Sequence, residues 1–214
     1  MKRFCWVILF LPAVSKADTY VVSFDGMHTQ EAKKVANVMR RRACAPVHVH
    51  YVPFAKATHQ NFVNNMNWLK KNVTKDDLVI IYLAGHGGVT RRGRFNLGAK
   101  RGTIWAREIC KTTESLPGTC LVLFDSCECG GALSEPWRRT TVVCSSASGE
   151  ISWTDVMCPA ICEIMRKGGT LRVRGFVFYL LHRIPRIAAT QHPKVYFGKS
   201  PNCSLSAIYH TEKR

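Results

Sequence analysis

The stretch that decides the fold reads Leu121-Val122-Leu123-Phe124-Asp125-Ser126-Cys127-Glu128-Cys129-Gly130-Gly131-Ala132-Leu133. Its four leading apolar residues predict a strand buried on both faces, which is typical of a parallel sheet. The small polar cluster and the two glycines that follow predict a sharp turn of the backbone. Cys127 would therefore stand at the carboxyl end of a central strand, where open α/β sheets bind their ligands.

The same design occurs once more, upstream. The apolar run 78–84 leads into Gly85-His86-Gly87-Gly88. Two neighbouring strands of this kind would bring His86 and Cys127 to one edge of a sheet. A thiol beside an imidazole is the arrangement of a cysteine nucleophile and its general base. For either residue alone, a structural interpretation would be preferred: a buried or disulfide-bonded cysteine, or a turn histidine.

Strand and helix patterns alternate around these two stretches. Strand patterns cover 19–24, 47–52, 140–145 and 192–198, and helical periodicity covers 28–43, 58–71, 103–113, 153–166 and 170–184. The basic, glycine-rich segment 89–102 is expected to form a hairpin or a mobile loop. The order β-α-β-α-β-α-β-β-α-α-β predicts a single α/β domain with an open, mainly parallel sheet of about six strands flanked by helices.

Composition and charge limit the classes of partner. The chain has 214 residues, of which 46% are hydrophobic, and this suits one globular domain with a sizeable core. Its formal charge of +17 favours acidic partners such as polyanions. The basic residues are scattered along the sequence, which favours a solvated surface over a dedicated nucleic-acid patch.

The first 17 residues resemble a secretory signal. A charged start is followed by an apolar core at 4–14 and by the small-x-small sequence Ser15-Lys16-Ala17. A mature domain spanning 18–214 would then be secreted or pass through the secretory pathway. An uncleaved N-terminal strand or anchor is the alternative. The apolar core is too short to span a bilayer and no later stretch approaches a membrane helix, so we expect no integral membrane segment.

The number of cysteines agrees with export. Ten are present, and eight remain when Cys5 is removed with the leader and Cys127 is set aside as a free thiol: Cys44, Cys110, Cys120, Cys129, Cys144, Cys158, Cys162 and Cys203. This even number permits up to four disulfides, with the pairing open. A zinc site is disfavoured because no Cys-x-x-Cys pair exists.

Two motifs carry a family resemblance. The segments 82–88 (Tyr-Leu-Ala-Gly-His-Gly-Gly) and 124–131 (Phe-Asp-Ser-Cys-Glu-Cys-Gly-Gly) resemble the His and Cys motifs of caspase-like (clan CD) cysteine proteases, closest to the metacaspase and paracaspase type. The segment from Gln191 to Gly198 also resembles the lead into the last strand of that fold. The interval from His86 to Cys127 is 41 residues (127 minus 86), near the ~50 known for caspases.

The resemblance implies a cysteine endopeptidase with a His86/Cys127 dyad. His86 would accept the thiol proton and then protonate the leaving amine. Gly87 carries no side chain and the Cys127 amide lies beside the sulfur, so these two backbone N–H groups are the candidate oxyanion donors. No cofactor and no obligatory metal are expected, because the acidic clusters that bind calcium in many metacaspases are not evident.

Substrate preference follows from the same resemblance. Asp125 stands where metacaspases, which cut after Arg or Lys, carry an aspartate, and Asp25 stands where such proteases place a second pocket residue. Carboxylates at these two positions would pair with the guanidinium of a substrate arginine. The alternative for Asp125 is a hydrogen bond to the backbone at the strand end, and the alternative for Asp25 is an ordinary turn. The segment 145–150 resembles the opposite pocket wall, with Ser145, Ser146 and Glu150 as candidates. Asp155 is a further source of negative charge.

The link between the Cys127 strand and the next one is too short for the cleavable linker of caspases, so a single-chain enzyme is expected. Whether it is a monomer or a homodimer is open. A second hypothesis is a catalytically inactive caspase-like fold that acts as a secreted basic binding protein for polyanions or a protein partner. The surplus of Lys and Arg supports it, since a fold alone does not prove activity.

Overall fold

Six strands form the main sheet of the computed structural model, which describes residues 17–42, 46–167 and 172–199. Their order across the sheet is β2-β1-β3-β7-β8-β9. The bounds are β1 Thr19–Asp25, β2 Val47–Val52, β3 Leu78–Ala84, β7 Thr119–Asp125, β8 Thr141–Cys144 and β9 Lys194–Tyr196. All neighbours are parallel except β9, which runs antiparallel to β8. The predicted α/β fold with about six mainly parallel strands is confirmed.

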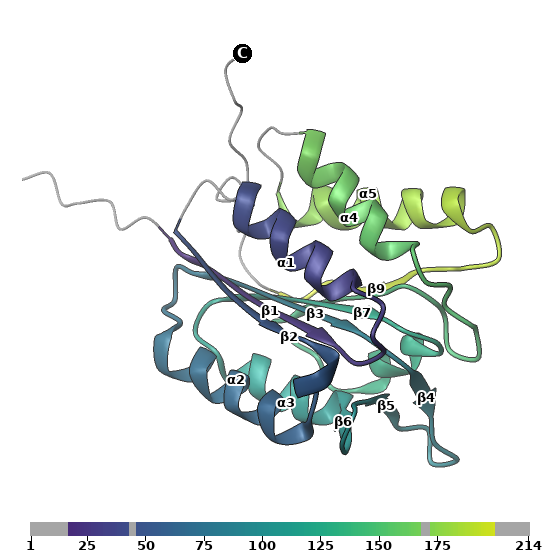
Figure 1. Ribbon diagram of the computed structural model, residues 1–214, viewed down its shortest axis with the longest axis horizontal. Helices are drawn as coiled ribbons and strands as arrows, with labels where there is room; N and C mark the ends of the chain where they lie inside the picture. The colour runs from purple at the N-terminus through teal and green to yellow at the C-terminus, as the bar shows by residue number, and fades with distance from the viewer. Residues whose placement is uncertain (1–16, 43–45, 168–171, 200–214) are drawn as a thin grey trace, which may run out of the picture.

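Helices cover both faces of this sheet (Figure 1). On one face lie α1 (Glu31–Arg42), α4 (Met157–Lys167) and α5 (Val173–Ile187). On the other lie α2 (His59–Asn72) and α3 (Ala106–Ser115), while short 3₁₀ turns occupy Phe54–Lys56 and Cys129–Ser134. Among the described residues no helix is long and apolar enough to cross a membrane.

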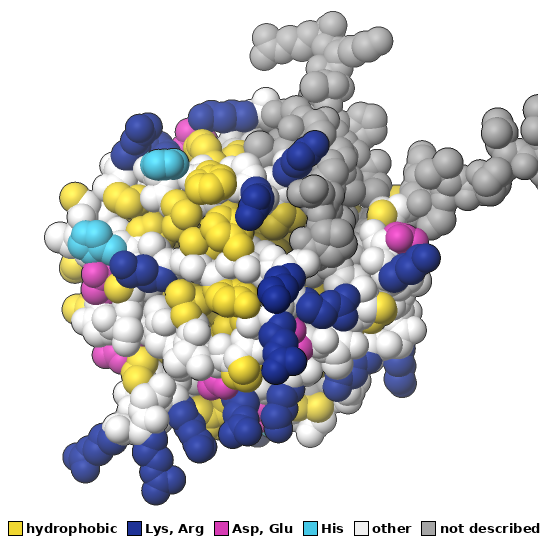
Figure 2. Space-filling view, turned by 180° about the vertical axis from the view of Figure 1, so that it is seen from behind, with side chains coloured by type: hydrophobic (Ala, Val, Ile, Leu, Met, Phe, Trp, Pro, Cys, Tyr) yellow, Lys and Arg dark blue, Asp and Glu magenta, His cyan; other side chains and the backbone are white. Residues whose placement is uncertain are grey.

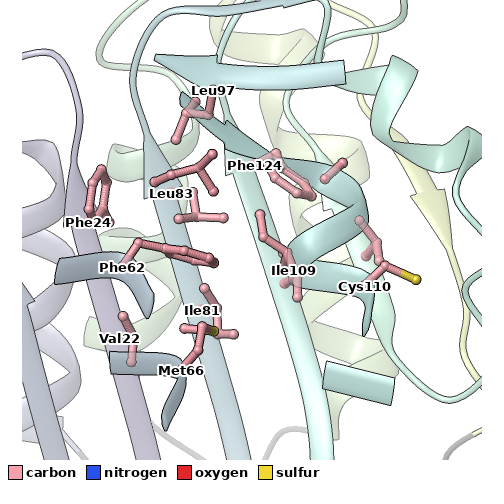
Figure 3. Packing of buried hydrophobic residues seen from close by; sticks show 14 of the residues in the cluster. Val22, Phe24, Phe62, Met66, Ile81, Leu83, Leu97, Ile109, Cys110 and Phe124 are labelled. Carbon is pink, nitrogen blue, oxygen red and sulfur yellow. The ribbon is translucent and has the colours of Figure 1, made fainter. Parts of the chain in front are cut away.

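The central strands β3 and β7 explain the two apolar runs in the sequence. All seven residues of each strand are buried, because helices cover the sheet from both sides. Alternate residues therefore enter two separate cores: Ile80 and Tyr82 join the α1, α4 and α5 layer, whereas Ile81 and Leu83 join the α2 and α3 layer. Figure 3 shows the second of these cores, with Phe62 of α2 among the residues that face the strands.

A second, smaller sheet occupies part of the segment that was expected to be a hairpin or mobile loop. Its strands β4 (Gly87–Val89), β5 (Phe95–Gly98) and β6 (Thr103–Trp105) pair antiparallel in the order β4-β5-β6. The hairpin is present, but β6 takes Thr103–Trp105 from the predicted helix, and α3 begins only at Ala106. Phe95 and Leu97 are buried, so this small sheet is anchored in the α2 and α3 core.

The predicted helices lie at the correct places in the sequence, but their predicted first residues precede the observed ones. α1 starts at Glu31, three residues later than predicted, because His28 and Gln30 have positive φ values of 64° and 63°. α4 starts at Met157 instead of 153, because Asp155 has a φ of 57°. As a result, the residues just before α4 form a loop instead of the predicted first helical turn.

The seven cysteines in the described part of the chain are all free thiols. The disulfides that the even cysteine number permits are therefore not formed among these residues. Six of the seven are buried and belong to the two hydrophobic cores. Cys5, Cys44, Cys203 and the predicted signal segment 1–16 lie outside the described residues.

The surface agrees with a scattered basic composition. On the face seen from behind, Lys and Arg side chains are spread around a group of hydrophobic side chains, with few acidic side chains among them (Figure 2). His48 and His50 on β2 are exposed, and they bond to Asp18 and Asn65 respectively. Both therefore act as polar surface residues.

Candidate active site

The ends of β3 and β7 bring the two motifs together. These strands are paired in register, with Ala84 opposite Asp125, and His86 and Cys127 each follow two residues later. Both side chains line one cavity of about 220 Å³. Its lining consists of Met27, Glu31, Gly85, His86, Asp125, Ser126, Cys127, Ser152, Trp153 and Thr154. An imidazole and a free thiol thus face the same small space at the carboxyl edge of the sheet.

Cys127 is partly exposed and faces the loop that precedes α4. The backbone N–H of Ser152 donates to the Cys127 sulfur at 3.4 Å, and the Ser152 carbonyl oxygen lies 3.8 Å from it. Within the described ranges, the backbone N–H of Cys127 makes no hydrogen bond. The sulfur is therefore held by one loop while the amide beside it stays available for a bound group.

The His86 loop is fixed on both sides. Gly98 donates its N–H to the His86 carbonyl oxygen at 2.7 Å, and Gly85 donates to the Asp125 carbonyl oxygen at 3.2 Å. The small sheet therefore holds the chain after His86, while the main sheet holds the chain before it. His86 itself is exposed, so its ring can be reached by a substrate.

Gly87 is required by a close approach of two backbones. A Cβ atom at this position would lie 2.4 Å from the Cys127 carbonyl oxygen and 2.5 Å from Ser126 Oγ, which no real side chain tolerates. By contrast, a Cβ atom at Gly88 would meet nothing within 4 Å. The absence of a side chain at Gly87 therefore lets the His86 loop lie directly against the Cys127 loop.

Glu128 ties the same two loops together. It adopts a left-handed backbone conformation, with a φ of 54°, and its carboxylate accepts a hydrogen bond of 2.7 Å from the Val89 N–H. Its own N–H donates to the Glu150 carbonyl oxygen at 2.7 Å. One residue thus connects the Cys127 loop to the small sheet and to the loop after β8.

The floor of the cavity is acidic. Asp125 is only 6% exposed, and Tyr82 donates its hydroxyl to Asp125 Oδ2 at 2.7 Å. Burial, followed by the nearby charge of Glu31, raises the pKa of Asp125 to about 8. Burial also raises the pKa of Glu31, which is 2% exposed and accepts hydrogen bonds from the Asp155 N–H and the Thr29 hydroxyl. Two carboxyl groups thus share one poorly solvated space.

Asp25 lies at the end of β1, beside this cavity but not among its lining residues. Its Oδ1 accepts hydrogen bonds from the N–H groups of Met27 and His28, so it organises the turn after the strand. Burial, followed by the charge of Asp25, raises the pKa of Tyr51. Asp25 Oδ1 thus makes the contacts of a turn, whereas Asp25 Oδ2 is buried without a hydrogen-bond partner among the described residues.

The predicted pocket wall supports the cavity from behind. Ser145 is buried and its hydroxyl lies 2.8 Å from that of Ser152, while Ser146 donates to the Ser126 carbonyl oxygen at 3.0 Å. The Glu150 carboxylate accepts from the N–H groups of Ala147 and His192. These three residues hold the loop after β8 in place and do not themselves line the cavity.

Gln191 is the buried residue that connects this loop to the last strand. Its side chain donates to the Ser145 carbonyl oxygen at 2.8 Å and to Ser152 Oγ at 3.1 Å, and it accepts from the Trp153 N–H at 3.0 Å. The side chain is fully buried. Three hydrogen bonds from one amide therefore fix the loop that lies in front of Cys127.

Sequence reasoning missed several lining residues, among them Glu31, Ser152 and Trp153. Glu31 opens α1, and an acidic residue in a first helical turn is common for reasons unrelated to a site. Ser152 and Trp153 had no signal, since Trp153 was assigned to a helix. Trp153 is 57% exposed, which is unusual for so large an apolar side chain. Such exposure is typical of a residue at the edge of a binding site, but it is known only from the structure. No group of three or more His, Cys, Asp or Glu side chains in the described ranges is arranged to hold a metal ion.

Comparison with known proteins identifies the family and the fold. A family model, described as the caspase domain, matches residues 24–196. The crystal structure of protein GSU0716 from Geobacter sulfurreducens superposes with a TM-score of 0.65 and 12% sequence identity, covering 92% of this chain and 98% of that one. At this identity the likeness shows the fold alone. No curated protein matches the sequence.

Proposed function

The chain belongs to the caspase-domain family of cysteine peptidases, and on that premise we propose that it is an endopeptidase that uses His86 and Cys127 to cleave proteins or peptides after Arg or Lys. The observation that carries the proposal is that an imidazole, a free thiol and two carboxyl groups line one cavity. The first pair supplies the chemistry and the second pair supplies the preference for a basic residue.

The chemistry begins with the thiolate of Cys127, which attacks the carbonyl carbon of the scissile peptide bond. His86 takes the thiol proton and then delivers it to the leaving amine, and a water molecule later hydrolyses the thioester. The oxyanion needs N–H donors that are already in place. The free amide of Cys127 and the amide of Gly87, a residue packed directly against the Cys127 loop, are suited to this role.

The substrate preference rests on Asp125 and Glu31. A guanidinium or ammonium group in the cavity would meet both carboxyl groups, and its charge would favour their ionised forms. Without that cation, their proximity and burial favour proton binding, as the raised pKa values of both groups indicate. An acidic side chain would find no partner on this floor, so cleavage after Asp is not expected.

The experiment is hydrolysis of matched fluorogenic peptides that differ only in ending with Arg, Lys, Asp or norleucine. We expect turnover after Arg and Lys, and loss of turnover in the Cys127→Ala and His86→Ala variants. The matched control is Cys110→Ala, which removes a buried thiol on α3 and leaves the cavity intact. Turnover after Asp but not after Arg or Lys would reject the acidic pocket, and turnover that survives in Cys127→Ala would reject the nucleophile.

The inactive binding protein stays the second candidate because of the charge of +17. Binding to heparin that weakens as salt increases, unchanged in Cys127→Ala and His86→Ala and accompanied by no peptide turnover or labelling by an arginyl electrophile, would favour that alternative. Peptide turnover that requires both His86 and Cys127 would reject the binding protein and support the peptidase.

A further inference from the structure

A second cavity lies between α1 and α4, away from the His86 and Cys127 loops. Its volume is about 460 Å³, within the roughly 300–1,000 Å³ typical of small-molecule sites. α1 contributes Lys34 and Arg41 to its lining, and α4 contributes Cys158, Cys162 and Arg166. These two helices lie side by side on one face of the main sheet, with α2 and α3 on the other face (Figure 1).

Two thiols share this cavity. Cys158 and Cys162 are four residues apart on α4, so their side chains lie on the same face of the helix. Cys158 is fully buried and Cys162 is 6% exposed. The Cys158 sulfur lies 3.6 Å from the Glu31 carbonyl oxygen and also within hydrogen-bonding contact of Cys162. Cys158 is thus the supporting thiol, and Cys162 is the less buried of the two thiols that line the cavity.

The charge around the thiols is positive. Lys34, Arg41 and Arg166 line the cavity together with them, and the lining contains no carboxylate. Lys34 pairs with Asp155 at 3.2 Å, whereas Arg41 and Arg166 form no ion pair within the described residues. The hydrogen bond from Cys158 lowers the pKa of Cys162 to about 7. Burial opposes this shift, whereas the positive charges of Arg166 and Lys34 add to it.

This combination points away from a metal ion, since three cationic side chains repel one, and towards an anionic reagent. We propose that Cys162 is a modification site for small disulfides that carry carboxylates, which Arg41 and Arg166 attract into the cavity between α1 and α4. The product is a mixed disulfide at Cys162. The proposal is independent of the peptidase function.

The step is thiol–disulfide exchange. The Cys162 thiolate attacks one sulfur of the small disulfide, a new bond forms between the two sulfurs, and the old disulfide bond breaks. The departing thiolate takes a proton from solvent, and its carboxylates leave with it. One half of the reagent stays attached to Cys162, with its carboxylates beside the two arginines.

The test uses the full chain with Cys127→Ala, which removes the partly exposed thiol of the candidate active site. The protein is incubated with oxidised glutathione, which is anionic, with 2-hydroxyethyl disulfide, which is neutral, or with cystamine, which is cationic. Fragment-ion mass spectrometry locates the adduct. We expect the adduct at Cys162, at least about 10-fold faster with oxidised glutathione than with the neutral reagent and slowest with cystamine.

Three variants make the result decisive. Cys162→Ser should remove the adduct, and the double variant Arg41→Ala/Arg166→Ala should make the three rates similar. Arg107→Ala on α3 is the matched control, because it removes an exposed arginine on the other face of the sheet and should leave the ranking unchanged. An adduct located at another cysteine, or equal rates with all three reagents in the protein with both arginines, would overturn the proposal.

Discussion

The Glu128 carboxylate accepts a hydrogen bond of 2.7 Å from the Val89 backbone N–H. Glu128 directly follows Cys127, and Val89 lies three residues after His86, so this single bond joins the two loops of the candidate site. Together with Gly87, whose position leaves no room for a side chain, it sets the distance between the proposed base and the proposed nucleophile.

We expect Glu128→Ala to lower kcat of the proposed peptidase by about 10-fold, with little change in KM. A hydrogen bond to a charged group contributes about 1.5–3 kcal/mol, and the bond from Val89 to Glu128 orients the two loops of the candidate site. Glu128 itself does not line the cavity, so peptide binding should change little. Glu128→Gln keeps an acceptor oxygen for Val89 and should retain most of the activity. The measurement is steady-state hydrolysis of an arginyl fluorogenic peptide. Equal loss in both variants would show that the charge of Glu128, not its hydrogen bond to Val89, matters.

Gly87→Ala should lower kcat/KM by about 100-fold, since its Cβ would lie 2.4 Å from the Cys127 carbonyl oxygen and push the two loops apart. Gly88→Ala is the matched control, because a Cβ there meets nothing within 4 Å. Activity and thermal unfolding of both variants would be compared. A fully active Gly87→Ala variant would contradict the close approach of the two backbones.

Asp125 should make the fold less stable as pH rises. Its pKa of about 8 lies above the ordinary value of 3.8, so the folded state binds more protons than the unfolded state between these values. The free energy of unfolding that protonated Asp125 contributes is therefore fully present below about pH 4 and is lost as pH rises towards 8. The free energy of unfolding of the unsubstituted chain should fall between pH 5 and 8. In Asp125→Asn this fall should be smaller by at least about 1 kcal/mol. Parallel curves from urea denaturation would contradict this assignment.

Binding of an arginyl peptide should tighten between pH 6 and 8, because the guanidinium favours the ionised form of Asp125. The measurement is Kd of a labelled peptide for the Cys127→Ala protein, which avoids turnover, with a norleucine peptide as the control. Glu31→Gln removes the charge that helps to raise the Asp125 pKa, so the transition should move to lower pH. A Kd for the arginyl peptide that does not change with pH would argue against Asp125 as the partner of the basic residue.

Gln191→Ala should destabilise the fold by about 2–4 kcal/mol and weaken binding of the same peptide, since it leaves buried partners at Ser145, Ser152 and Trp153 without hydrogen bonds. His192→Ala is the neighbouring control. Its ring bonds to Glu150 at an exposed position, so little change is expected. Similar unfolding midpoints for the two variants would show that the Gln191 amide does not fix the loop.

The main sheet could be predicted from the sequence because β3 and β7 are apolar along their whole length and end in small, turn-forming residues. Parallel pairing then places the residues after both strands at one edge, which is why His86 and Cys127 could be located without coordinates. The small sheet was only partly anticipated. Its strands have three or four residues, too few for a clear alternation, and two of them contain glycine.

The acidic floor of the cavity was harder to predict than the positions of His86 and Cys127. Asp125 is the last residue of a recognisable strand, but Glu31 belongs to a helix that reaches the cavity through tertiary packing against the main sheet and α4. Positive φ values at Gln30 and Asp155 determine where α1 and α4 begin, and local helical periodicity does not reveal them. For the same reason Trp153 was assigned to a helix, whereas the structure places it in the exposed loop at the cavity.

The strand before Cys127 is more firmly held than the chain after His86. Cys127 follows a fully buried strand with partners on both sides, whereas the chain after His86 continues into a three-stranded antiparallel sheet at the rim of the molecule. Amide hydrogens of β7 should therefore exchange with solvent only on global unfolding, and those of β4 through smaller, local openings. A local opening of β4 would break the hydrogen bond between Val89 and Glu128 and free the chain after His86, while the rest of the protein stays folded.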